Sequence, residues 1–548
     1  MSYTLRSRMM LAVVVSLMPM LSSRAGAQQS SDVPTITMRA NTRMVVVDVV
    51  VKDKKGQPVT GLKAEDFAVD ENGKKQKIAT FTPPGADQAA PLPMPPGIMT
   101  NKPEYLKPAG VPTVLLLDAA NSHFLDQAYG RTQMLKYAVQ QSIAASPMAV
   151  MTLTNRLEVL QDFTTDPRVL LAAIKKVQPQ EPLLLNATLP ADAAILAGQL
   201  ATSQLLVENF QSQFVGYVLE RRTEATIEAL RELARVLGGF PGRKNVVWLT
   251  ADFPFALIPE DTNMSDAELL ADLPSKARVS NNVIVNGGGN ALADLRGRYN
   301  EPIRQAQAAV ASAGIAVYPV DMRGLMARGI DVNVTSSLEE LASQTGGKAY
   351  VNQNEIMNGI ALAVSDEKAS YSIGYYPENK KWDGKFRAIK VKLSQGDREV
   401  RYRKGYFAYD PALVKNPHFE SDVAATLQLN ASATQVIFMA QAKPAGPQKT
   451  TVVFLVDAHT ISVEDAGNNK RLNVALYAEL FDAKGKSIGS RSSKVDRAFD
   501  AATYQQILDK GMMVPLDVEV PAGAKELRLA VLDNKTGYIG TVSGPIGQ

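Results

Sequence analysis

Mainly apolar runs in the middle of the chain predict strands that are buried on both faces of a sheet. Four such runs occupy residues 113–118, 149–154, 245–250 and 315–320. Helical patterns separate them, and after the first run apolar residues recur at i, i+3, i+4 and i+8 from Leu135. Strands that alternate with helices favour a parallel sheet covered on both faces. We therefore expect an α/β domain with a doubly wound parallel sheet over residues 113–365.

Strictly alternating apolar and polar positions predict antiparallel β-structure on either side of this domain. The alternating stretches suggest a small β-sandwich-like module over 34–82, a β extension over 366–410 and a C-terminal β-sandwich over 420–548. Residues 83–112 contain nine prolines, which interrupt regular elements and predict a linker. Within the α/β domain, the stretches near 191–222 and 253–300 exceed a minimal fold and are expected to be insertions.

The first 27 residues have the pattern of a secretion signal. Arg6 and Arg8 precede an apolar run from Met9 to Leu21, and Ala25-Gly26-Ala27 is a small-x-small cleavage site. Cleavage there removes three arginines and no acid, which lowers the net charge from +4 to +1. We therefore expect an exported protein, periplasmic or extracellular, with no nucleic-acid partner and no later segment that spans a membrane. The absence of cysteine excludes disulfides and thiolate chemistry.

Polar side chains follow the first buried strand, where Asp118 is succeeded by Asn121 and Ser122. The carboxyl ends of strands in open α/β sheets are the usual position of ligand sites. A carboxylate and a hydroxyl therefore lie at a position where a ligand is expected to bind. The structural alternative is that Asp118 caps the helix that follows.

The order of strand, Asp-x-Ser-x-Ser and helix resembles the metal-site signature of von Willebrand factor A domains. This chain has Asp118 and Ser122 at the outer positions and Ala120 in place of the middle serine. More specifically, it resembles the secreted von Willebrand factor A-related proteins found in Acidobacteria, from about Val45 to Ala408. The stretches that carry this resemblance are 61–67, 162–167, 241–248, 318–321, 345–347, 374–377 and 403–408.

The resemblance implies a hard divalent cation, Mg²⁺ or Mn²⁺, held by Asp118 and Ser122 and by two further ligands. Thr223 is the best match for a threonine on a second loop, with Thr188 as the alternative. Asp252 matches an aspartate after a later strand, although Ala251 stands directly after Thr250. The missing serine and this shift of one residue predict a degenerate site. Its residues are expected to be Asp118, Ser122, Thr223 and Asp252.

The chain lacks the H-E-x-x-H, G-x-S-x-G and Walker motifs of common catalytic sites. We therefore expect a non-catalytic protein-interaction or adhesion module with a protein partner, which the resemblance also implies. One alternative is a metal-assisted hydrolase acting on cell-envelope material, with His123 or Asp321 as the base. Asp321 is equally explained by a local pair with Arg323. The other alternative is a scaffold whose β-modules make the contacts.

Overall fold

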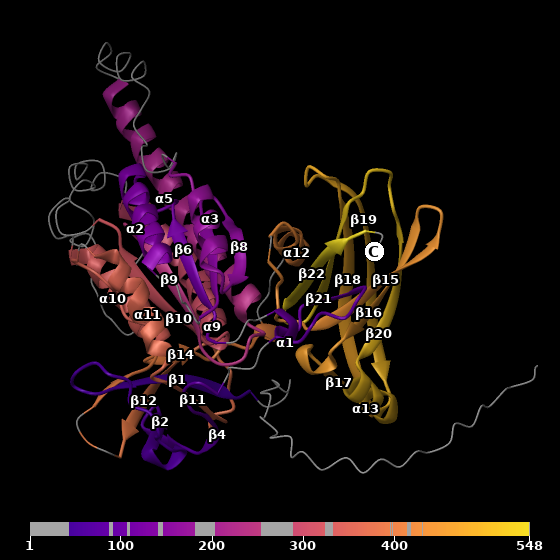
Figure 1. Cartoon of the computed structure of the whole chain (residues 1–548), viewed down its shortest axis with the longest axis horizontal. Helices are drawn as coiled ribbons and strands as arrows, with labels where there is room; N and C mark the ends of the chain where they lie inside the picture. The colour runs from indigo at the N-terminus through magenta and orange to yellow at the C-terminus, as the bar shows by residue number, and fades with distance from the viewer. Residues whose placement is uncertain are drawn as a thin grey trace, which may run out of the picture. The chain divides into compact units, whose positions relative to one another are not determined.

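The structure is a computed structural model, and Figure 1 shows its elements along the chain. It describes residues 43–546 apart from 87–90, 107–109, 141–145, 181–202, 254–288, 324–331, 354, 395, 397, 414–417 and 430. The secretion signal, Thr188 and parts of both predicted insertions lie outside the described residues. Residues Thr37–Gln548 form one compact unit by their internal contacts.

The central sheet of the α/β domain has five strands in the order β10-β9-β6-β7-β8. These strands are β6 (Thr113–Asp118), β7 (Met148–Leu153), β8 (Leu157–Thr164), β9 (Lys244–Thr250) and β10 (Ile315–Asp321). The first four in spatial order pair in parallel, whereas β8 pairs antiparallel with β7. The sheet is therefore mixed rather than wholly parallel, because Thr154–Arg156 close a hairpin at its edge.

Helices cover both faces of this sheet (Figure 1). Successive side chains of a strand point to opposite faces, and because these strands are mainly apolar, both faces have to be covered. One face of β6, including Leu115 and Leu117, packs with α2 (Phe124–Gln140), α3 (Pro167–Lys176) and α11 (Ile356–Glu367). The other face, including Val114 and Leu116, packs with α5 (Ser203–Leu237), α9 (Gly289–Ser312) and α10 (Val332–Thr345). All six residues of β6 are buried, so its apolar run reflects burial on both sides.

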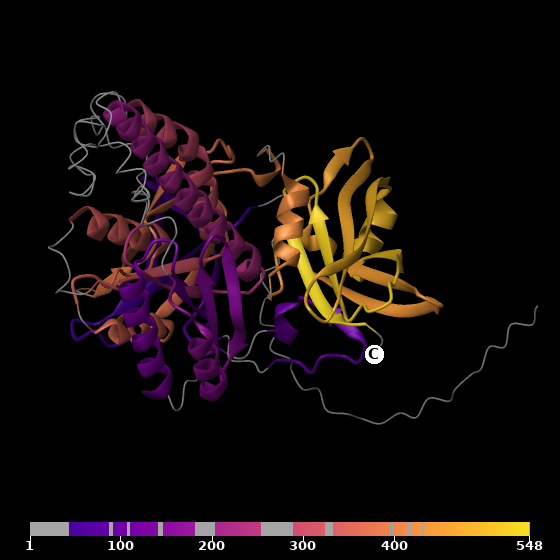
Figure 2. The same cartoon turned by 90° about the horizontal axis from the view of Figure 1, so that it is seen from above.

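Local helix signals agree with the structure, but the extents of the insertions do not. Asp166 caps α3 by accepting a hydrogen bond from the backbone N–H of Arg168, and Pro167 begins the helix. The predicted insertion over 253–300 contains the first half of α9, which runs beside α5 (Figure 2). The predicted insertion near 191–222 contains the first part of α5. Both helices belong to the cover of the sheet.

Strands from 45–82 and from 370–407 pair with one another, although about 300 residues separate them (Figure 1). One sheet has the order β13-β1-β11-β4 and the other β14-β12-β2-β3, around a shared apolar core. The prediction treated 34–82 and 366–410 as separate modules, and the pairing corrects it. The strands are β1 (Val45–Lys52), β2 (Phe67–Glu71), β3 (Lys74–Gln76), β4 (Ile78–Thr82), β11 (Ser370–Tyr375), β12 (Phe386–Leu393), β13 (Glu399–Arg401) and β14 (Gly405–Phe407).

Two antiparallel sheets with a common apolar core make up the C-terminal region. The first has the order β20-β16-β15-β5, and the second joins β17, β18, β21 and β22 with β19 beside β18. The predicted β-sandwich remains our interpretation of these two sheets. Their strands are β15 (Phe438–Gly446), β16 (Lys449–Val456), β17 (Glu464–Ala466), β18 (Asn469–Phe481), β19 (Ser487–Phe499), β20 (Met512–Glu519), β21 (Glu526–Asp533) and β22 (Ile539–Pro545). Two helices accompany them, α12 (Phe419–Leu427) and α13 (Ala501–Lys510).

The proline-rich stretch contributes to the C-terminal sheet instead of only linking domains. Residues Ile98–Thr100 form β5, which pairs with β15, and Pro103–Leu106 form the short helix α1. The fully buried Asn101 side chain donates to the carbonyls of Ala433 and Val436, each at 2.7 Å, and accepts from the N–H of Phe438 at 2.9 Å. This asparagine satisfies three backbone groups of the C-terminal region that lie 332, 335 and 337 residues later in the chain.

A buried ionic network joins the α/β domain to the β1–β11 sheet. The carboxylate of Asp366, on α11, is fully buried and contacts Lys52 Nζ at 2.6 Å and the Arg401 guanidinium. The Tyr318 hydroxyl donates to the same carboxylate at 2.7 Å. Burial alone raises the pKa of Asp366, but Arg401, Lys52 and Tyr318 outweigh it, so the pKa lies below its ordinary value.

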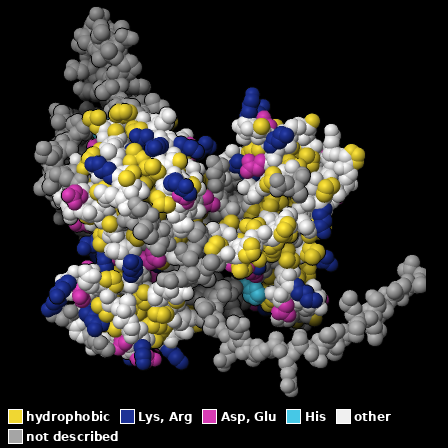
Figure 3. Space-filling view, in the orientation of Figure 1, with side chains coloured by type: hydrophobic (Ala, Val, Ile, Leu, Met, Phe, Trp, Pro, Cys, Tyr) yellow, Lys and Arg dark blue, Asp and Glu magenta, His cyan; other side chains and the backbone are white. Residues whose placement is uncertain are grey.

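Charged side chains of both signs are scattered over the face shown in Figure 3. This pattern accords with the small net charge of +4 for the whole sequence. Among the helices of the described residues, none has the length and apolar character needed to cross a membrane.

Candidate functional site

The candidate site lies at the carboxyl edge of the central sheet, between β6 and β9. These two strands are neighbours, and the chain passes from β6 to β7 on one side and later returns to β9 on the other. This reversal of direction is a topological switch point, where loops diverge and leave a crevice. The loop after Asp118 and the loop after Thr250 meet there.

Asp118 ends β6 and is fully buried. Its Oδ1 accepts a hydrogen bond from the N–H of Asn121 at 3.0 Å, and its Oδ2 accepts from Asn121 Nδ2 at 2.9 Å. Trp248 Nε1 and Thr250 Oγ1, both on β9, donate to the same Oδ2 at 2.9 and 3.0 Å. Burial raises the pKa of Asp118, and the hydrogen bonds from Asn121, Trp248 and Thr250 offset only part of that effect. The carboxylate therefore ties β6 to β9 inside the protein.

Ser122 also serves the contact between the two loops. Its side chain is fully buried, and Oγ accepts a hydrogen bond from the backbone N–H of Ala251 at 2.9 Å. Gln127, on α2, donates to the Ser122 carbonyl at 2.7 Å and so fixes the start of that helix. Asp118 and Ser122 lie in the same loop, and the structure gives each of them a partner within the chain.

Arg222 supplies the positive charge that contacts Asn121 and Asp252, and its role was not predicted from the sequence. Its Nε donates to Asn121 Oδ1 at 2.9 Å, and its Nη2 donates to Asp252 Oδ2 at 2.8 Å. The side chain of Arg222 is 9% exposed and that of Asp252 is 32% exposed. Asn121 Nδ2 also donates to Thr226 Oγ1 at 3.0 Å. One continuous network therefore runs from Asp118 through Asn121 and Arg222 to Asp252.

A sequence signal for Arg222 existed in the helical periodicity. Arg222 shares a helix face with Ala225 and Ala229, at i+3 and i+7, and both alanines are buried. A charged residue on a buried face has to reach a partner at the edge of the core. The partner itself could not be foreseen, because Asn121 and Asp252 lie on other segments.

The structure does not bring Thr223 to Asp118. Thr223 lies within α5, and its Oγ1 donates to the carbonyl of Leu219 at 2.6 Å. The prediction of Thr223 on a second loop is therefore wrong, because α5 is already helical at that position. Thr226, one turn further along α5, contacts the site through Asn121 instead.

The two residues proposed as a hydrolytic base have different surroundings. Asp321 is paired with Arg323, whose Nη2 lies 2.8 Å from Asp321 Oδ2 and whose backbone N–H donates to Oδ1 at 2.9 Å. The local pair weighed from the sequence is thus confirmed, and it occupies the carboxylate. His123 is partly exposed in the loop before α2, where its carbonyl accepts from the N–H of Gln127.

The residues at this edge do not fit a divalent cation. Within the described residues, no group of three His, Cys, Asp or Glu side chains lies close enough to hold a metal ion. Asp118 Oδ2 already accepts three hydrogen bonds and Ser122 Oγ accepts one. Mg²⁺ needs near-octahedral oxygen ligands with open lone pairs. The Arg222 guanidinium adds a positive charge at the same place.

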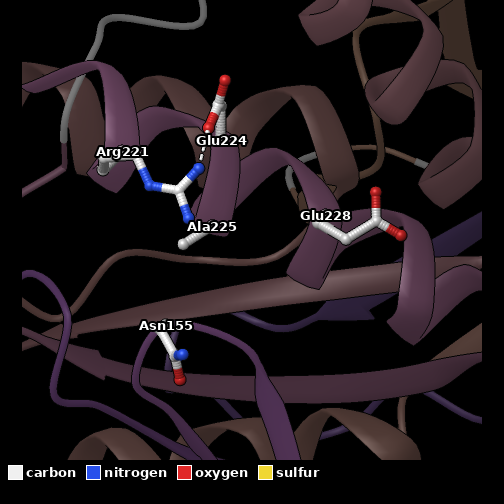
Figure 4. A pocket seen from close by; sticks show the side chains of 5 residues that line it. All are labelled: Asn155, Arg221, Glu224, Ala225 and Glu228. Carbon is white, nitrogen blue, oxygen red and sulfur yellow. Dashed lines mark hydrogen bonds and ion pairs between the residues drawn. The ribbon is translucent and has the colours of Figure 1, made fainter. Parts of the chain in front are cut away.

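A small cavity of about 150 Å³ lies beside α5 near this edge. Figure 4 shows Arg221 and Glu224 meeting on the helix, with Asn155 of the β7–β8 turn on the opposite side and its amide directed away from them. The ion pair between Arg221 Nη1 and Glu224 Oε2 measures 2.8 Å, and both side chains are substantially exposed. We assign no site here, because the charges pair with each other.

No family model matches the chain, and no curated protein matches it. Its structural neighbours include von Willebrand factor A domains. The vWF domain of the type V pili tip protein Mfa5 from Porphyromonas gingivalis is 10% identical, with a TM-score of 0.26, over 46% of this chain and 94% of its own. A von Willebrand factor type A protein from Catenulispora acidiphila is 9% identical, with a TM-score of 0.21, over 93% of this chain and 74% of its own. An aerotolerance-related membrane protein from Bacteroides fragilis is 12% identical, with a TM-score of 0.25, over 47% of this chain and 100% of its own. Because these TM-scores are below 0.5, we draw no functional conclusion from the neighbours.

Proposed function

We propose that this chain is an exported, non-catalytic protein-interaction module that contacts a protein partner at the carboxyl edge of its central sheet. The observation that carries the proposal is an apolar rim directly beside the Asp118 network. Phe124 and Leu125 begin α2 immediately after Ser122 and His123, and they are 42% and 72% exposed. Adjacent exposed apolar side chains beside an ordered polar centre are typical of a contact surface rather than of a hydrolytic cleft.

The state of the acidic residues supports a non-catalytic role. A general base needs a carboxylate or imidazole within reach of a substrate proton. Asp118 is engaged by Asn121, Trp248 and Thr250, while Asp252 and Asp321 each pair with an arginine. We accordingly interpret Asp118, Ser122 and Asp252 as the remains of a metal-dependent adhesion site whose oxygens now hold the two loops together.

Export rests on the sequence pattern of the first 27 residues. Cleavage after Ala27 predicts a mature protein that begins at Gln28. The periplasm or the cell surface would then be the place where a partner is met. Mass spectrometry of the N-terminal peptide from the native protein tests this step, and a retained Met1 contradicts it.

The absence of cysteine makes the contact surface directly testable. We would prepare Leu125→Cys and, as a matched control, Met513→Cys on β20, where the native side chain is 69% exposed. Each variant carries a cleavable photo-crosslinker on its only thiol and is mixed with cell-envelope extract of the source organism. We expect Leu125→Cys to capture a discrete protein that excess unlabelled wild type displaces and excess Leu125→Ser does not.

The Met513→Cys control distinguishes contacts at the carboxyl edge of the central sheet from contacts made by the β-modules. Specific capture from Met513→Cys alone would favour contacts made by the C-terminal sheets. Capture from neither variant, or capture from Leu125→Cys that wild type does not displace, would contradict the proposed edge.

A further inference from the structure

The hydrogen-bond network at the carboxyl edge includes the positively charged side chain of Arg222. Arg222 reaches from α5 to the loops that follow β6 and β9, where its guanidinium donates to Asn121 and to Asp252. Asn121 in turn donates to Asp118 Oδ2 at 2.9 Å. The two carboxylates at the ends of β6 and β9 are thus linked through one positively charged side chain.

We propose that Arg222 permanently replaces the divalent cation at this edge, so that the site joins its two loops without any metal. A metal ion between two loops at the carboxyl edge of a sheet holds them together by binding oxygens from both. The planar guanidinium performs the same bridging with directed N–H donors, and it remains charged at every physiological pH.

Three features of the surrounding residues fit a guanidinium and oppose a metal ion. Asn121 offers Oδ1 to Arg222 and uses Nδ2 to bond Asp118, so an amide mediates where direct carboxylate ligation would be needed. Ser122 Oγ accepts the N–H of Ala251, which engages the hydroxyl oxygen within the chain. Ala120, at 4% exposure, supplies no oxygen at the middle position of the loop.

The positive charge of Arg222 also opposes the binding of a divalent cation. The side chain of Arg222 is 9% exposed, so its charge is only weakly screened by water. A divalent cation binding between the two loops would be repelled by this guanidinium and would also have to displace the Arg222–Asp252 ion pair of 2.8 Å. A partner that binds at this edge should therefore remain bound after chelation of metals, although the inference about Arg222 holds whether or not such a partner exists.

Thermal unfolding with Mn²⁺ as the probe tests the proposal on the whole chain. We expect the melting temperature of the wild type to be unchanged by roughly 10 mM Mn²⁺ and by excess chelator. Arg222→Ala should melt at a lower temperature and gain a Mn²⁺ response of about 3 °C or more, because Asp252 and Asn121 lose their cation. Arg221→Ala, which removes the neighbouring exposed arginine of α5, is the matched control and should resemble the wild type.

The outcomes that overturn the proposal are distinct. A Mn²⁺ response of the wild type that disappears in Asp118→Ala would show a working metal site. Loss of stability in Arg222→Ala with no gained Mn²⁺ response would mark an ordinary structural arginine. If Arg222→Ala does not fold, Arg222→Lys decides: a retained charge should leave it folded and insensitive to Mn²⁺, and a Mn²⁺ response in that variant contradicts the replacement.

Discussion

Neutralising Asp366 should destabilise the protein strongly, because this carboxylate is the shared counter-ion of two cations on different elements. Its side chain is fully buried, whereas Lys52 and Arg401 are 10% and 17% exposed at their side chains. Asp366→Asn keeps the volume and a hydrogen-bonding group for Tyr318 but removes the negative charge. Both cations are then left in a low-dielectric environment without compensation.

The magnitude follows from the general cost of breaking a buried ion pair, which is roughly 3–5 kcal/mol. Because the partial exposure of Lys52 and Arg401 lets water recover some solvation, we expect the lower end, about 3 kcal/mol. A loss of this size lowers the melting temperature by roughly 6–12 °C where the α/β domain, about 250 residues, unfolds as its own cooperative unit, and by less where the whole compact unit unfolds together. Adding Lys52→Met to Asp366→Asn should restore part of the stability, because one uncompensated charge is removed.

The assay is thermal and urea unfolding followed by the fluorescence of Trp248 and Trp382, the two tryptophans of the chain. Asp496→Asn is the control, because Asp496 pairs with Arg471 on the surface and should not shift the midpoint measurably. The low pKa of Asp366 means that its stabilisation is present above about pH 4 and is lost as the pH falls further. Equal midpoints for Asp366→Asn and the control at pH 7 would refute the reasoning.

Three further perturbations have defined outcomes. Gly347→Ala should lower the melting temperature strongly in calorimetry, because its Cβ would lie 1.8 Å from the Val317 carbonyl oxygen, whereas Gly396→Ala, with nothing within 4 Å, should not. Burial raises the pKa of Glu232 to about 7 despite its ion pair with Arg235, so stability present below about pH 4.5 is lost as the pH rises through 7. The melting temperature of the wild type should therefore fall more between pH 5 and pH 8 than that of Glu232→Gln. Asn101→Ala leaves buried backbone groups unpaired and should cost about 2–4 kcal/mol of unfolding free energy in urea titration. An unchanged midpoint would contradict the structural role of the Asn101 side chain.

Local patterns predicted four of the five strands of the central sheet, because the apolar pattern of each segment indicates which of its own faces are buried. The run at 113–118 became a fully buried strand, and Asp166-Pro167 became the start of a helix. The edge strand β8 was missed because only one of its faces is well buried, and its pattern of buried and half-buried residues is short and irregular.

The site was predictable only in part. The position of Asp118 at a strand end follows from the sequence, and Ser122 lies four residues after Asp118 in the loop that follows. The roles of these side chains depend on Trp248, Ala251 and Arg222, which arrive from β9 and α5. Thr223 was assigned to a loop because the family resemblance expects a threonine on a second loop, whereas α5 already spans that position.

By itself, the sequence determined most strands of the central sheet, the faces that they bury and where a carboxylate meets the end of a strand. Those properties depend on neighbours within a few residues, so periodicity carries them. Only the tertiary structure decided that β1 pairs with β11, that Asn101 serves the C-terminal sheet and that Arg222 links Asn121 to Asp252. Pairing between distant segments depends on the geometry of the whole fold, and a long side chain takes its role from whichever charge the fold places within its reach.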